Sequence, residues 1–78
     1  MHIIKILKLE EETKLSIYDD DLNLLETESF IDLSTLNFYL QTLSKKYEIK
    51  KGLLIIYNRN KNTVDLIVAR DENSFYIS

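Results

Sequence analysis

Apolar residues recur with a period of two in the first thirty residues, which predicts β-strands. Residues 3–10 mix β-branched residues with interspersed lysines, and residues 14–18 alternate strictly between apolar and polar side chains. Residues 24–30 can return as a third strand, with Glu26 and Glu28 on one shared face. We expect that face to meet water.

The period then changes to three and four residues, which indicates one amphipathic helix over about residues 33–47. Its apolar stripe comprises Leu33, Leu36, Leu40, Leu43 and Tyr47. Asp32 or Ser34 can cap the first amide groups, because both carry a side-chain oxygen at the start of the pattern. Gly52 is the expected stop, by a left-handed cap or the turn that follows.

Strand patterns resume after the helix. Residues 53–57 are apolar on both faces, which predicts a central strand. Residues 58–62 form a polar loop of hairpin length, and residues 64–69 alternate as the returning strand. We expect a turn at residues 71–73 and a last short strand at residues 75–77.

The summed order βββαβββ predicts an α+β fold in a single domain spanning residues 1–78. We expect an antiparallel sheet of about 4–6 strands with the helix, about 33–47, packed on one face. One helix covers only one face, so part of the other face, with Tyr18, Tyr57 or Phe75, must meet water, a partner or a second copy. A homodimer is therefore an open alternative.

The amino-acid composition argues against catalysis by this chain. It has no cysteine, one glycine and one histidine, His2, which lies next to the N-terminus. One glycine cannot build a phosphate-binding loop, and a terminal imidazole lacks the rigid shell of a catalytic base. The run Asp19 to Asp21 places alternate carboxylates on opposite faces, so it does not form a calcium loop. We expect no enzyme activity, no catalytic residue, no metal and no cofactor.

No apolar run approaches the ~20 residues of a membrane helix, and lysines interrupt the N-terminal one. We therefore expect no membrane association and a cytoplasmic location, which is the host cytoplasm if the chain is encoded by a phage.

The net charge of −3 is unevenly distributed. Residues 1–37 carry nine acids against three lysines, whereas residues 38–78 carry seven bases against four acids. The acidic triplets 10–12 and 19–21 flank one strand, so they should lie at opposite ends of a hairpin. The candidate partner-binding residues form an acidic edge of Asp19, Asp20, Asp21, Glu26 and Glu28. The candidate nucleic-acid-binding residues are Lys45, Lys46, Lys50, Lys51, Arg59 and Lys61.

These features predict a small non-enzymatic binding protein, an inhibitor or adaptor of the kind that phages and mobile elements carry. Its acidic edge would imitate nucleic-acid phosphate and occupy the basic groove of a host protein, such as a defence nuclease of the CRISPR effector type. One alternative is a nucleic-acid-binding module that uses the basic residues between 45 and 61. Another is a self-associating structural subunit.

Overall fold

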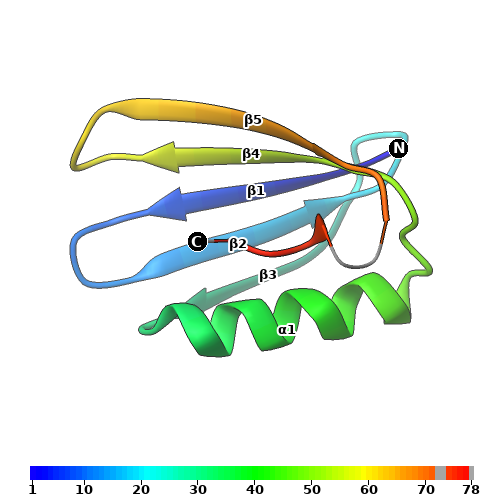
Figure 1. Cartoon of the computed structure of the whole chain (residues 1–78), viewed down its shortest axis with the longest axis horizontal. Helices are drawn as coiled ribbons and strands as arrows, with labels where there is room; N and C mark the ends of the chain where they lie inside the picture. The colour runs from blue at the N-terminus through cyan, green and yellow to red at the C-terminus, as the bar shows by residue number, and fades with distance from the viewer. Residues whose placement is uncertain (72–73, 78) are drawn as a thin grey trace.

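The computed structural model of the chain describes residues 1–71 and 74–77. It confirms the α+β prediction: one sheet of five strands carries one helix, in the order βββαββ (Figure 1). The elements are β1 (His2–Lys8), β2 (Thr13–Tyr18), β3 (Leu24–Phe30), α1 (Leu33–Lys46), β4 (Gly52–Asn58) and β5 (Thr63–Ala69).

The strands lie in the order β3-β2-β1-β4-β5, so the first strand occupies the centre of the sheet. The prediction of a wholly antiparallel sheet is wrong at this centre, because β1 and β4 run parallel. The cause is α1, which crosses one face of the sheet between β3 and β4 and so returns the chain in the direction of β1. The other three strand pairs are antiparallel.

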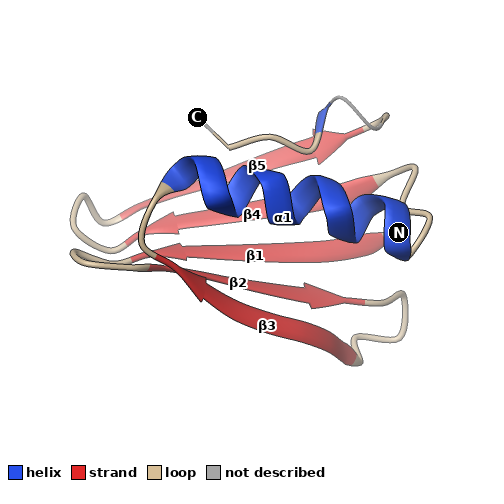
Figure 2. Ribbon diagram, turned by 90° about the horizontal axis from the view of Figure 1, so that it is seen from below, coloured by secondary structure: helices blue, strands red, loops and turns tan. Residues whose placement is uncertain are grey.

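The helix α1 lies across one face of the sheet (Figure 2), and the buried hydrophobic residues of the strands and the helix form one core between them. Alternate strand residues point to this face, and they are fully or almost fully buried in β1, β2 and β4: Ile4, Ile6, Leu15, Ile17, Leu54 and Ile56. The helix adds Leu36, Leu40 and Leu43, which confirms the centre of the predicted stripe. Residues 53–57 are confirmed as a central strand, since β4 pairs on both sides.

The helix begins where the capping residues predict. The Asp32 carboxylate accepts a hydrogen bond from the backbone N–H of Thr35 at 2.7 Å, so Asp32 is the N-cap. This bond holds the pKa of Asp32 below its ordinary value. Lys45 and Lys46 occupy the last turn, where the helix dipole favours positive charge.

The prediction that Gly52 stops the helix is wrong. The helix ends at Lys46, and the left-handed residue after it is Glu48, with φ of 52°. Gly52 is instead the first residue of β4. A Cβ atom at this position would lie 3.1 Å from Cε1 of Phe75, so the glycine makes room for that ring.

The predicted strand at residues 75–77 is also wrong. Phe75 and Ile77 are buried, but they belong to an irregular segment that runs beside α1 (Figure 2). Its backbone bonds to helix side chains: Asn37 bonds both to the carbonyl oxygen and to the N–H of Ile77, each at 2.7 Å, and Gln41 donates to the carbonyl of Phe75. These bonds satisfy the backbone groups that a strand neighbour would otherwise satisfy. In the predicted turn at 71–73, Glu72 and Asn73 lie outside the described residues.

Candidate functional site

The β2–β3 turn gathers three of the five residues of the predicted acidic edge. The Asp19 carboxylate accepts hydrogen bonds from the backbone N–H groups of Asp21 and Asn23, both at 2.9 Å, and from the Asn23 side chain. These bonds hold the pKa of Asp19 below its ordinary value, the Asn23 N–H contributing most. Asp20 pairs with the N-terminal amino group of Met1. The turn therefore uses Asp19 to fix its own backbone.

Glu26 and Glu28 share the face of β3 that looks toward α1, since their partners across the strand pair are Ile17 and Leu15. The expectation that this face is wet is wrong for Glu26, which is only 22% exposed. Glu28 is exposed. The sequence pattern identified the shared face correctly but could not show that the helix lies over its Glu26 end.

Glu26 links β3 to the helix. Its carboxylate accepts a hydrogen bond from the Tyr39 hydroxyl at 2.9 Å and pairs with the Lys46 ammonium at 3.2 Å. Hydrogen bonds from Tyr47, Tyr39 and Lys46 lower the pKa of Glu26, and the same carboxylate raises the pKa of Tyr39 to about 12. The pKa of Lys46 is raised by the same contact. Two members of the acidic edge, Asp19 and Glu26, thus serve the fold.

The basic residues do not form one patch. Lys45, Lys46, Lys50 and Lys51 lie around the C-terminal end of α1, before β4 begins, whereas Arg59 and Lys61 lie in the loop after β4 ends. The seven residues of β4 separate the two groups by about 23 Å. Lys46 is in addition engaged by Glu26 and lies 5.3 Å from the centre of the Tyr47 ring.

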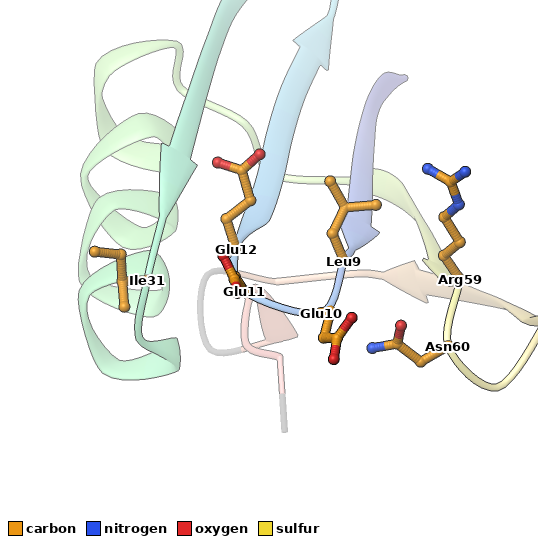
Figure 3. A pocket seen from close by; sticks show the side chains of 7 residues that line it. All are labelled: Leu9, Glu10, Glu11, Glu12, Ile31, Arg59 and Asn60. Atoms are coloured by element: carbon orange, nitrogen blue, oxygen red, sulfur yellow. The ribbon is translucent and has the colours of Figure 1, made fainter.

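An open depression of about 770 Å³ lies at the opposite end of the sheet from these helix lysines. It is lined by Leu9, Glu10, Glu11, Glu12, Ile31, Arg59 and Asn60. Figure 3 shows that these side chains fan out instead of converging on a point, and Ile31 points away from the others. The Arg59 backbone N–H bonds to the Lys8 carbonyl at 3.0 Å, which holds the β4–β5 loop against the end of β1. The depression offers no convergent set of groups.

The face of the sheet opposite α1 is not covered by any element of residues 1–71 and 74–77 (Figure 2). On three adjacent strands, β1, β4 and β5, its residues are mostly apolar: Ile3, Leu7, Leu53, Ile55, Tyr57, Val64, Leu66 and Val68. We call these eight residues the open apolar face. Those on β5 are the most exposed, with Leu66 at 66%. Apolar area gathered in this way is typical of interaction surfaces.

The remainder of the same sheet face is mostly polar. On β2 and β3 it presents mostly polar residues, Lys14, Ser16, Thr27 and Ser29, and the Ser16 and Thr27 hydroxyls bond to each other at 3.1 Å. Tyr18 and Leu24 lie on the same face at one end of this half. Lys5 of β1 lies between the two halves, with its ammonium 5.9 Å from the centre of the Tyr18 ring. The sheet face is therefore divided along β1 into a polar half and an apolar half.

Sequence reasoning found part of this surface and missed the rest. It predicted an uncovered second face and placed Tyr18, Tyr57 and Phe75 on it. Tyr18 and Tyr57 do lie there, but Phe75 is fully buried on the helix side. The pattern shows that residues 53–57 are apolar on both faces, but without the strand order it could not show that apolar residues of β1 and β5 extend the uncovered face of β4.

Within the described residues, no three His, Cys, Asp or Glu side chains are grouped so that they could hold a metal ion. No helix there is long and apolar enough to cross a membrane. Comparison with family models, with curated proteins and with solved structures finds no match to this chain.

Proposed function

We propose that this chain is a small non-enzymatic protein-binding module, an inhibitor or adaptor, that binds its partner through the open apolar face. The observation that carries the proposal is the asymmetry of the uncovered sheet face. Its β2–β3 half is mostly polar, as expected for a surface in water, whereas its β1–β4–β5 half is apolar apart from Lys5, as a buried face would be. Binding through that half would remove apolar area from water and so favour association.

A protein with this role requires a surface that fits its partner, but it requires no catalytic residues. A phage-type inhibitor that covers a functional surface of a host protein, for example a defence nuclease, acts in this way. In this proposal the acidic edge has only a secondary part in binding. Asp19 and Glu26 make contacts within the fold, whereas Asp21 and Glu28 are exposed. Direct binding of nucleic acid by the basic residues is less favoured, because these residues lie at two ends of the sheet.

The test compares two variants that add the same charge to opposite halves of the sheet face. Ile55→Lys places an ammonium in the open apolar face, and Thr27→Lys places one on the polar half. Both are first checked for folding by circular dichroism. A partner captured with the unmodified chain is then purified, and its affinity for each variant is measured by calorimetry.

We expect Ile55→Lys to weaken binding by at least about tenfold, because a desolvated charge without a partner is costly. Thr27→Lys should change the affinity little. Equal affinities for the two variants would contradict the proposed surface. A loss of binding on charge reversal of Asp21 and Glu28 alone would instead support the acidic edge. Binding of nucleic acid that weakens steeply with salt would favour the basic residues.

A further inference from the structure

The two edges of the sheet differ in how well they are protected against pairing with another chain. An edge strand has a row of unpaired backbone N–H and C=O groups, which proteins guard with charges, prolines or bulges. At one edge, β3 has Glu26 and Glu28 and a register shift against β2. At the other edge, β5 pairs with β4 over seven residues without a shift. Its only charged residue is Asp65.

The unguarded edge is also apolar. Residues 63–68 are all exposed. The exposed fractions are 57% for Val64, 66% for Leu66, 43% for Ile67 and 44% for Val68. Among the described residues, no strand lies beyond β5. The strand therefore offers both backbone hydrogen bonds and apolar side chains to a further strand.

We propose that β5 pairs antiparallel with β5 of a second copy, about a two-fold axis through Leu66. Two copies of one strand pair in many registers, but this one lets all seven residues of Thr63–Ala69 find a partner. It places Leu66 opposite Leu66 and Val64 opposite Val68. These three side chains lie on one sheet face, so on that face apolar residues meet apolar residues.

Charge also favours this register. Asp65 lies opposite Ile67 of the second copy, whereas a register centred one residue earlier would put two Asp65 carboxylates directly opposite each other, which is destabilising. The register centred on Leu66 therefore keeps the Asp65 carboxylates of the two copies apart.

The size of the contact sets its expected strength. Stable complexes bury at least about 1,000 Å² in total, or about a tenth of the 5264 Å² surface of each copy. A seven-residue strand about 24 Å long, with four apolar side chains exposed, provides an area at the low end of that range. We therefore infer a reversible dimer with a dissociation constant in about the micromolar range.

The dimer would be one continuous sheet of ten strands, because each copy contributes five. A two-fold axis perpendicular to the sheet keeps both helices on one side and joins the two open apolar faces on the other. This inference goes beyond the proposed function, since it concerns the backbone edge of β5, although Val64, Leu66 and Val68 of that strand also belong to the open apolar face. Either one can fail without the other.

The first experiment uses the absence of cysteine from the chain. Leu66→Cys, Val64→Cys and Thr27→Cys each introduce one exposed thiol, and the purified variants are oxidised at equal concentration. Leu66 lies opposite itself in the proposed register, so Leu66→Cys should cross-link at least about tenfold faster than the other two. Val64 faces Val68 and not itself, and Thr27 lies at the opposite edge.

The second experiment measures mass by sedimentation equilibrium over about 10 μM to about 1 mM. The unmodified chain should change from monomer to dimer, and Leu66→Lys should stay monomeric while keeping its circular dichroism spectrum. A chain that is monomeric throughout would overturn the proposal and would indicate that β5 receives another protein or only solvent. A dimer in which Ile55→Cys cross-links and Leu66→Cys does not would also overturn it, in favour of two sheets packed face to face.

Discussion

At the scale of single residues, some of the predicted binding carboxylates have a structural role. They hold the backbone and the helix in place. Asp19 and Glu26 are the examples, one within a turn and one between β3 and α1. The number of acidic residues along a sequence cannot distinguish a structural role from partner binding, because both roles place acidic residues in turns and on sheet edges.

The Glu26 cluster gives a prediction about titration. The Glu26 carboxylate raises the pKa of the Tyr39 phenol to about 12, because it accepts the phenol's hydrogen bond and opposes a second negative charge. In Glu26→Gln, the Tyr39 midpoint should fall toward its ordinary value of 10.0. Ring-carbon NMR of labelled tyrosine would report it, with Glu28→Gln as the control. An unchanged Tyr39 midpoint would show that the Glu26 contact is not formed in solution.

The same contact makes stability depend on pH. The pKa of Glu26 is lower in the folded chain than in the unfolded one, so its stabilisation is present above its ordinary pKa of 4.5 and is lost as the pH falls through the folded value. Glu26→Gln should therefore cost about 1 kcal/mol at neutral pH and nothing in strong acid. Urea titrations at several pH values would check this. A difference that persists in strong acid would assign the effect to packing.

Asn37 gives a prediction about a buried polar group. The residue is 7% exposed, and its side chain bonds to both backbone groups of Ile77. Asn37→Ala would leave a buried N–H and a buried C=O without partners, which should cost about 3 kcal/mol in the free energy of unfolding. Urea denaturation would measure it, with the exposed Asn60→Ala as a control near zero. A cost below about 1 kcal/mol would mean that water replaces the amide.

At the scale of elements, the sequence pattern correctly predicted features that depend on interactions between residues close in sequence. The helix differs from its predicted bounds by one residue, and β3 has its predicted bounds, because capping and periodicity act over a few residues. The parallel pairing of β1 with β4 was missed, since strand neighbours depend on where the crossover returns. The segment 75–77 was misread because burial against a helix and pairing in a sheet favour the same apolar residues.

Gly52 gives a prediction about how β4 meets the C-terminal segment. Gly52→Ala would bring a methyl group to 3.1 Å from the Phe75 ring and 3.3 Å from the His2 carbonyl oxygen. We expect a loss of about 1–2 kcal/mol by overpacking, measured by thermal denaturation. The further change Phe75→Leu should cost less in the Gly52→Ala background than alone, because a smaller side chain relieves the contact. Strict additivity of the two changes would contradict this account.

At the scale of the whole molecule, one layer of core holds all the elements together. Phe75 is fully buried and lies against Gly52 of β4, and its carbonyl bonds to Gln41 of the helix. Phe75→Ala should therefore cost about 3–5 kcal/mol, a large part of the stability of a small domain.

The loss should be shared by the whole fold. Amide hydrogen exchange in Phe75→Ala should accelerate in β1, β4 and α1 together, because a small domain unfolds as one unit. Tyr76→Ala, which changes an exposed neighbour, is the matched control. Faster exchange confined to residues 74–77 would show that this segment is an independent unit.

The central position of β1 has a consequence for synthesis on the ribosome. The β1–β2–β3 meander can pair as soon as residue 30 has emerged, but the other side of β1 receives its neighbour only when residues 52–58 follow. During that interval one side of β1, the central strand of the finished sheet, is unpaired and available for pairing with a neighbouring nascent chain. Slow translation between residues 31 and 52 would lengthen the exposure, so codon choice in this stretch should affect the yield of native protein.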